Sequence, residues 1–489
     1  MMNYKKIVVA CCALFMATTL SAQKALDPEL QKQVDQIATT IKSDPSGAAK
    51  AYEELLKGKN KKNVSLIAAI GTAYLENDNM QMAIFYRDKG DEVNSRSAEL
   101  YMLKGDIDLK NKKVGSAGAS YQQAMNADKD CFEAYSKFAR IYVGVNPQLS
   151  VEKLEEYKAR HPQDVRVDRE LGNAYYQMGK YGNAKTAYDT FMKSGQPNEQ
   201  DYARYSNLLF LSKDYAESLD MAKQGLTLNP DDHLMKRMLV YNNYELKNYA
   251  EGVTAAENFF ANPDTTYFSY LDHLYYGRLL FKQNSSAKAI AEFEKALSMD
   301  ETKAAEILKE LSSVYESLQD YPNAIVCYNK YLEAAESDDV QDLFMLGRLN
   351  YMAASLPETA EQLTDTTATG ISVVKAGYIA EADTIFAEVA QRVPDSYLGT
   401  FWRARVNALA DPETTLGLAK PYYEAALAIL QANEKSAPAN IIECLRYLGY
   451  HYVQQGELEL SEPYWQKILE IDPNEATAKQ AMEWISQSK

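Results

Sequence analysis

Basic and amide residues gather in three neighbouring segments of the chain, and they are the side chains best suited to bind a ligand. An arginine guanidinium is planar, so it pairs with two oxygens of a carboxylate or phosphate, and it also stacks on aromatic rings. These residue types predict a binding site for an anionic group. In these three segments the candidate residues are Arg166, Arg169, Asn173, Arg204, Asn207, His233, Lys236 and Arg237, and Arg278 follows in a later segment.

No other set of residues in the sequence predicts catalysis, a metal site or a cofactor. The sequence has no glycine-rich phosphate loop, and no nucleophile stands in a pattern with a base and an orienting group. The cysteines that follow residue 22 are more than a hundred residues apart, so we expect free thiols rather than a disulfide or zinc site. The histidines are equally dispersed, at His161, His233, His273 and His451. We therefore expect no enzymatic activity, no metal and no cofactor.

Composition excludes two further classes of protein. The chain has 489 residues, and 46% of them are hydrophobic, which is too many for a disordered chain. Its formal net charge of -16 argues against a nucleic-acid-binding protein, because phosphate neutralisation requires a basic face. Tyrosine is abundant at 36 residues, against 14 phenylalanines and 3 tryptophans.

An internal repeat of about 34 residues must position the candidate side chains. Gly71, Gly105 and Gly172 lie in similar settings, one or two repeats apart. After Gly172 an apolar helix is expected to end at Gly179, and a second helix is expected to begin near Tyr181. Small residues at 172 and 184 let two antiparallel helices approach closely. The sequence therefore predicts a series of helix pairs.

This pattern resembles the tetratricopeptide repeat (TPR), in which small and aromatic residues recur at fixed offsets in two helices. The resemblance covers about ten pairs, and many tyrosines fall on its packing positions. It implies an all-α TPR solenoid, a right-handed superhelix of antiparallel helix pairs, with first helices lining the concave side. The clearest copies begin near Val64, Ala98, Val165, Glu199, Asp232, Tyr270, Ala305, Val340 and Ile442.

The repeat pattern also predicts the organisation of the chain. The segment between the main array and its C-terminal pairs is rich in threonine and acid, and it is either a tolerated insertion or an arm that contacts a partner. The predicted parts are a signal peptide (1–22), a degenerate helix pair (23–63), a tandem TPR array (64–354), an inserted loop (355–370), C-terminal TPR pairs (371–474) and a capping helix (475–489).

The first residues have the pattern of a secretory signal peptide. Lys5 and Lys6 precede the apolar run 7–20, and small residues allow cleavage after Ala22. The run is too short to span a bilayer as a helix. Cys11 offers a lipoprotein alternative, although the apolar run continues past it. The junction looks like those of Bacteroidota secreted proteins. We expect a periplasmic or secreted protein without a transmembrane segment.

Arginine is concentrated on the predicted first helices, where ten of the 14 arginines fall. TPR domains that grip the C-terminal carboxylate of a peptide use Lys, Asn, Asn, Lys and Arg at set positions. Arg169, Asn173 and Arg237 fit three of these, whereas Arg204 and His233 replace the expected Asn and Lys. The resemblance therefore implies an anion-binding groove. The alternative is that the arginines pair with acids on adjacent helices, such as Glu170, Glu199 and Asp201.

These observations predict an exported, non-enzymatic scaffold that binds a protein or peptide of the cell envelope through its concave groove, with a captured segment that is acidic or carries a free C-terminus. One alternative is a protein that binds glycan or envelope polymer through groove tyrosines and arginines. Another is a subunit without chemistry of its own beside a catalytic partner.

The basic bend at residues 57–62 is either a solvated linker or a contact with anionic lipid or glycan. Peripheral association with the envelope is a further expectation.

Overall fold

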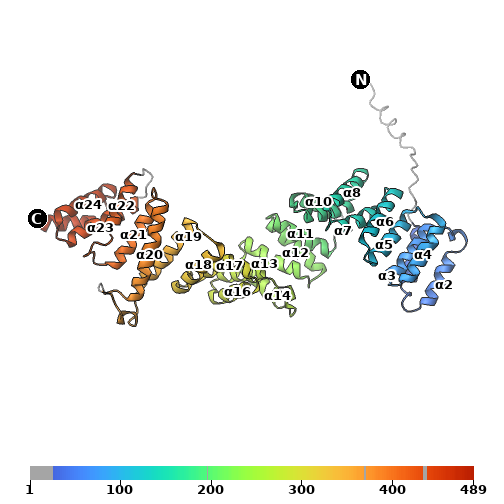
Figure 1. The fold of residues 1–489 in the computed structure, drawn as a ribbon, viewed down its shortest axis with the longest axis horizontal. Helices are drawn as coiled ribbons and strands as arrows, with labels where there is room; N and C mark the ends of the chain where they lie inside the picture. The colour runs from blue at the N-terminus through green and yellow to red at the C-terminus, as the bar shows by residue number, and fades with distance from the viewer. Residues whose placement is uncertain (1–25, 195, 368–369, 433–437, 489) are drawn as a thin grey trace, which may run out of the picture. The chain divides into compact units, whose positions relative to one another are not determined.

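A computed structural model describes residues 26–194, 196–367, 370–432 and 438–488 (Figure 1). The predicted signal peptide, with Cys11, lies outside the described residues. Within the described ranges the chain forms 25 α-helices and no strand, so the prediction of an all-α fold is confirmed. No helix in these ranges combines the length and the apolar character that a membrane span requires.

The chain divides into two compact units, Met1–Met238 (unit 1) and Leu239–Lys489 (unit 2). Helix α13 (His233–Glu245) contains the boundary between them. The helices of unit 1 that precede α13 are α1 (Pro28–Ala38), α2 (Pro45–Leu55), α3 (Val64–Glu76), α4 (Met80–Asn94), α5 (Ala98–Lys110), α6 (Val114–Ala127), α7 (Phe132–Tyr142), α8 (Pro147–Arg160), α9 (Arg166–Gln177), α10 (Tyr181–Ser194), α11 (Glu199–Leu211) and α12 (Tyr215–Leu228).

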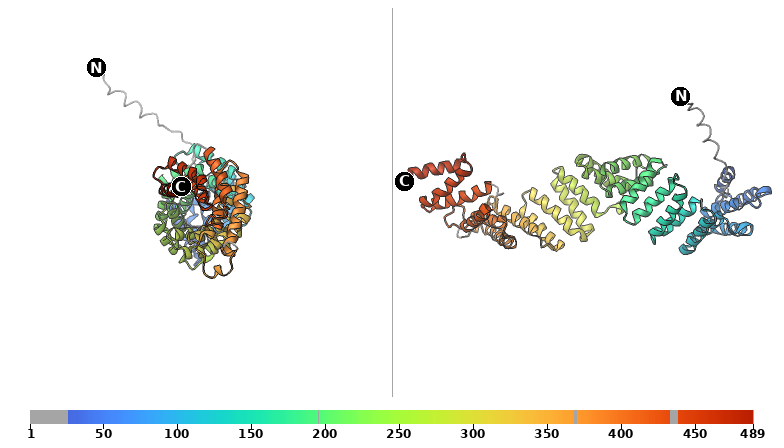
Figure 2. Two further views of the ribbon diagram at one scale, coloured as in Figure 1. Left: turned by 90° about the vertical axis from the view of Figure 1, so that its left-hand side faces the viewer. Right: turned by 90° about the horizontal axis from the view of Figure 1, so that it is seen from above.

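Unit 2 continues the same alternation of first and second helices. Its helices after α13 are α14 (Tyr249–Phe260), α15 (Tyr270–Lys282), α16 (Ser286–Met299), α17 (Ala304–Ser317), α18 (Tyr321–Ala335), α19 (Val340–Ser355), α20 (Val373–Arg392), α21 (Tyr397–Ala410), α22 (Lys420–Ala432), α23 (Pro438–Gln454), α24 (Leu458–Ile471) and α25 (Ala476–Ser488). Within each unit, successive helix pairs stack side by side (Figure 2).

The α9–α10 pair shows why these residues form antiparallel helices. The chain turns between the helices at Gly179, whose φ of 68° costs glycine nothing, and Asp78 and Lys213 adopt the same left-handed conformation in the equivalent turns. Lys180 N–H closes the turn by donating to Tyr175 O at 2.9 Å. Gly172 then lets the Tyr188 ring lie directly against the backbone of α9. The small residues of the repeat therefore set the closeness of each pair.

Tyrosines form much of the core, as the repeat pattern predicts. Tyr74, Tyr121, Tyr188 and Tyr328 are all buried in the apolar clusters of their units. Tyr181, the first residue of α10, is not part of this core and remains 40% exposed. The abundance of tyrosine therefore follows largely from packing between helices.

The segment between α19 and α20 is an irregular excursion from the repeat. In its described part, Thr366 and Ser372 form an isolated antiparallel bridge. Glu358 Oε1 accepts a hydrogen bond from Ser372 N–H at 2.6 Å, which draws the start of α20 onto the loop. The hydrogen bond between Glu358 and Ser372 therefore joins the two ends of the segment.

Candidate functional site

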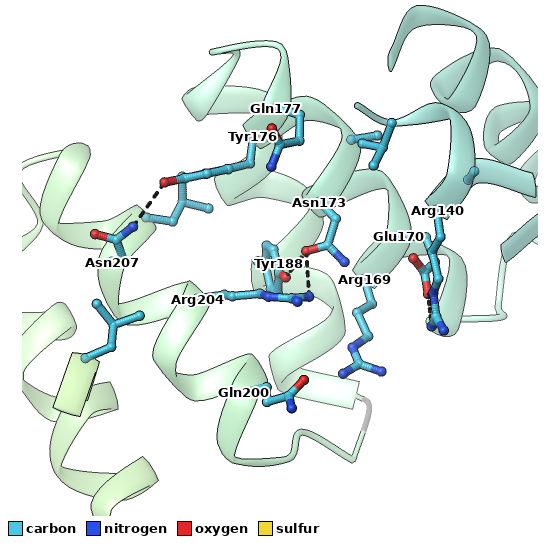
Figure 3. A pocket seen from close by; sticks show the side chains of 15 residues that line it. Arg140, Arg169, Glu170, Asn173, Tyr176, Gln177, Tyr188, Gln200, Arg204 and Asn207 are labelled. Atoms are coloured by element: carbon cyan, nitrogen blue, oxygen red, sulfur yellow. Dashed lines mark hydrogen bonds and ion pairs between the residues drawn. The ribbon is translucent and has the colours of Figure 1, made fainter. Parts of the chain in front are cut away.

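A cavity of about 570 Å³ lies in unit 1 between the first helices of three successive repeats, α7, α9 and α11 (Figure 3). We call this cavity the groove. Four of the predicted site residues line it: Arg169, Asn173, Arg204 and Asn207. The other lining residues are Ala139, Arg140, Val143, Glu170, Ala174, Tyr176, Gln177, Tyr188, Gln200, Leu208 and Leu234.

Arg140 enters the groove from α7, but its charge is paired with a neighbouring acid. Its Nε and Nη2 donate to Glu170 Oε1 at 3.0 and 2.5 Å, and Ser136 Oγ donates to the same oxygen at 2.9 Å. The hydrogen bond to Glu170 raises the pKa of Arg140. Because the Glu170 side chain is only 4% exposed, the ion pair fixes α7 against α9 and leaves little free anionic surface in the groove.

Arg169 is paired in the same way with the next helix. Its Nε donates to Asp201 Oδ1 at 2.5 Å, and the Asp201 side chain is 1% exposed. The other oxygen of Asp201 accepts from Asn198 N–H at 3.0 Å, which completes a capping box at the start of α11. Arg169 therefore neutralises a buried helix-capping acid.

Arg204 is the cation in the groove that lacks an acidic partner among the described residues. Its Nη1 donates to Asn173 Oδ1 at 3.2 Å, and no carboxylate in the described ranges forms an ion pair with it. Tyr188 Oη donates to the same amide oxygen at 2.6 Å (Figure 3). Burial raises the pKa of Tyr188 to about 12, so the hydroxyl remains a donor at neutral pH. Together Asn173 and Tyr188 orient a guanidinium whose positive charge is not neutralised.

Amide side chains surround this guanidinium. Asn207 Nδ2 donates to Tyr176 Oη at 3.1 Å, and Gln177 and Gln200 also line the cavity (Figure 3). Amides hydrogen-bond both donors and acceptors of a peptide backbone. The groove can therefore bind an extended polar chain and pair one of its anionic groups with Arg204.

The remaining predicted residues lie elsewhere. Arg166 borders an adjoining hollow, where it pairs with Asp164 at 2.7 Å and lies 4.3 Å from the Phe132 ring. The hydrogen bond from Arg166 lowers the pKa of Asp164 to about 2. Arg278 lies in unit 2, on α15, and pairs with Glu310 and Glu306 at 2.7 and 2.8 Å. On α13, Lys236 pairs with Asp231 at 3.1 Å, and the same helix carries His233 and Arg237.

Several groove residues are absent from the set predicted by sequence. Arg140 shares its repeat offset with Arg278, so the first-helix pattern could have identified it. Glu170 was predicted only as an acid that pairs with an arginine. Nothing in the local sequence distinguishes Gln177 or Gln200 from other surface glutamines. Across the described residues, no cluster of three or more His, Cys, Asp or Glu side chains is arranged to hold a metal ion.

Comparison with protein families identifies the repeat. Models of the tetratricopeptide repeat match residues 170–193, in unit 1, and residues 276–339, in unit 2. The first of these segments covers most of the α9–α10 pair, including Asn173 and Tyr188 of the groove. The chain thus contains tetratricopeptide repeats, and its fold is the all-α solenoid of helix pairs that such repeats build.

Solved structures with similar helical arrangements include bacterial proteins. The C-terminal part of a TPR repeat-containing protein from Cytophaga hutchinsonii is 25% identical, with a TM-score of 0.46, over 57% of this chain and 99% of that one. PilF of Pseudomonas aeruginosa is 15% identical, with a TM-score of 0.39, over 47% and 100%. A tetratricopeptide repeat protein from Parabacteroides merdae is 13% identical, with a TM-score of 0.29, over 58% and 98%. Comparison with curated protein sequences gives no match.

Proposed function

We propose that the chain is an exported, non-enzymatic scaffold whose groove holds an extended segment of a protein partner and pairs an acidic group of that segment with Arg204. Tetratricopeptide repeats serve as protein-interaction scaffolds, which supports the general role. The specific observation behind the proposal is Arg204, a guanidinium oriented by Asn173 and given no carboxylate by the described part of the chain.

The surrounding pairs support this choice of residue. Arg140 and Arg169 each neutralise an acid that is nearly inaccessible to solvent. A ligand carboxylate that paired with Arg169 would have to compete with a buried capping acid, whereas one that paired with Arg204 would add hydrogen bonds to its Nε and Nη2. Charge-assisted hydrogen bonds of this kind are stronger than those between neutral groups. Arg204 is therefore the expected anchor.

A random-peptide array tests the proposal even before the partner is identified. Peptides that the chain captures should be enriched in Asp and Glu or in free C-termini, and each should lose affinity when its acid is changed to the amide. Removing a charge-assisted pair should weaken binding about tenfold or more. Comparing free with amidated C-termini for each peptide separates an acidic side chain from a terminal carboxylate.

Two variants make the array specific to the groove. Arg204→Glu should abolish capture of the acidic peptides. Arg96→Glu makes the same change in charge at another exposed arginine of unit 1 that has no ion pair among the described residues, and it should bind like the parent. Equal capture by the parent and by Arg204→Glu would overturn the proposal. Selective retention on a glycan array would point instead to the glycan-binding alternative.

Export forms a separate part of the proposal and rests on the pattern of residues 1–22. Fractionation of the native cells should place the protein in the periplasm or outside the cell. N-terminal sequencing of that material should begin at Gln23. A protein that stays in the cytoplasm with residues 1–22 attached would contradict export and leave the peptide-array result unaffected.

A further inference from the structure

The bend between α2 and α3 carries the densest run of positive charge in unit 1. Residues 57–62 (the basic bend) contain four lysines and no acid, within a chain of net charge -16. All four lysine side chains are exposed. The bend contributes no residue to the groove or to the hollow beside it.

The basic bend has a defined conformation. Gly58–Asn60 form a single 3-10 turn, and Lys61 N–H donates to Gly58 O at 3.3 Å. Asn60 Nδ2 donates to Leu55 O at 3.0 Å, which ties the turn to the end of α2. At the other end, Asn63 caps α3 by accepting from Leu66 N–H at 3.1 Å. The four lysines therefore lie together on an ordered bend.

Three of these lysines lack the acidic partner that many other lysines of unit 1 have. The Lys57 side chain pairs with Glu54, but the ammonium groups of Lys59, Lys61 and Lys62 form no ion pair or hydrogen bond with any described residue. By contrast, the ion pairs of unit 1 include Lys104–Asp91, Lys137–Asp106 and Lys158–Asp168. Like charges held close together repel, so an external anionic surface would lower the electrostatic free energy of the bend.

The shape and chemistry of the bend favour one kind of anionic surface. Small anions bind in concave sites that exclude water, whereas exposed lysines on a bend can contact a flat, extended surface. Lysine is a hydrated point charge on a flexible stem, which suits attraction to many headgroups rather than bidentate recognition of one. Each lysine near an anionic bilayer surface contributes about 1 kcal/mol of attraction, so a group of four can produce measurable binding. Nucleic acid is disfavoured, because residues 57–62 contain no aromatic side chain on which a base could stack and no arginine for bidentate contact with a base.

We propose that the basic bend is a contact surface for an anionic lipid bilayer and attracts the N-terminal part of unit 1 to it. The inference is independent of the groove and of the peptide that the groove binds. It requires only that the bilayer carries phosphate headgroups with net negative charge.

Co-sedimentation of the purified chain with lipid vesicles tests this inference. Vesicles of phosphatidylcholine with about one third phosphatidylglycerol should retain at least about tenfold more protein than vesicles of phosphatidylcholine alone. Salt near 1 M should remove the difference, because the Debye length falls to about 3 Å. The triple variant Lys59→Glu, Lys61→Glu, Lys62→Glu should lose the enhanced binding while keeping the circular dichroism and melting curve of the parent.

A matched variant separates the bend from general charge. Lys112→Glu, Lys113→Glu, Lys129→Glu makes the same change in net charge at exposed lysines of other bends in unit 1 and should still sediment with the anionic vesicles. Residues 1–25 are identical in all three proteins, so differences among them report the substituted lysines. An equal loss of binding to anionic vesicles in both variants would overturn the inference. So would binding of the parent to neutral vesicles that equals its binding to anionic ones. Displacement by soluble glycerophosphoglycerol at the headgroup concentration would also overturn it, by showing recognition of a single headgroup.

Discussion

At the scale of single residues, arginines that look equivalent in the sequence have different roles. Arg169 and Arg278 each reach an acid 32 residues further along the chain, on the next first helix. Such pairs join neighbouring repeats and neutralise acids that are buried, as Asp201 is, or partly exposed, as Glu310 is. Arg204 also lies on a first helix but reaches an amide instead. The partner of an arginine, rather than its presence, therefore separates a structural residue from a candidate ligand-binding one.

Asp342 on α19 provides a pH-dependent prediction for unit 2. Its carboxylate accepts hydrogen bonds from Tyr328, Tyr331, Ser337 and Lys309 at 2.9, 2.7, 2.7 and 3.1 Å. Burial opposes ionisation, but these donors outweigh it and lower the pKa of Asp342 to about 2. Because the folded-state pKa lies below the unfolded value of about 3.9, the group stabilises the fold fully above that value and loses its contribution as pH falls toward 2.

Asp342→Asn should therefore lower the free energy of unfolding by roughly 2 kcal/mol at neutral pH, with a difference that shrinks below about pH 4. Urea denaturation at a series of pH values measures this difference. Asp339→Asn on the same helix is the control, because asparagine caps a helix as well as aspartate does. If the loss of unfolding free energy in Asp342→Asn does not change with pH, the lowered pKa of Asp342 is not its cause.

At the scale of the helix pair, a glycine of the first helix accommodates an aromatic ring of the second. A Cβ placed on Gly172 would lie 2.5 Å from Tyr188 Cδ2, and one on Gly277 would lie 2.6 Å from Phe293 Cε1. Gly449 and Trp465 repeat the arrangement near the end of unit 2, where a Cβ on Gly449 would lie 2.7 Å from Trp465 Cε2. The pairs share a spacing of 16 residues, so one steric rule sets the separation of helices in both units.

Gly172→Ala should destabilise the chain by about 1–3 kcal/mol, because the added methyl group displaces the Tyr188 ring from a filled core. It should also weaken peptide capture, since the Tyr188 hydroxyl orients Asn173 in the groove. Gly182→Ala, on α10 with open space around it, should be neutral or stabilising by about 0.5–1 kcal/mol through helix propensity. Urea denaturation compares the two variants, and equal effects would show that contact with the ring is not the cause.

At the scale of the whole molecule, each repeat packs only against its neighbours, as in other solenoids. Within unit 1, α9 contacts α10 and α8, and within unit 2, α17 contacts α16 and α18. Stability in such an array is a sum of local terms, so a defect should remain close to its source. The two compact units provide a direct way to observe this locality.

Arg169→Ala should leave Asp201 buried without its charged partner, at a cost of about 2 kcal/mol. Hydrogen–deuterium exchange should then show faster exchange in α9 to α12 and unchanged exchange in α15 to α18. Arg204→Ala removes an exposed side chain without a carboxylate partner, so the exchange rates of both regions should stay unchanged. A loss of protection spread over both units by Arg169→Ala would show that the array unfolds as one cooperative body.

The sequence by itself determined the class of fold and the positions of many helices. Glycines and aromatics at fixed spacing predicted the α9–α10 pair with its turn at Gly179, because steric fit within one repeat depends on residues close in the chain. Only the tertiary structure decided which arginines are neutralised. Those partners lie about one repeat away, and their contact depends on side-chain direction across the packed face between neighbouring helices. Local periodicity does not specify that direction, and so Arg204 became distinct from Arg169 only in three dimensions.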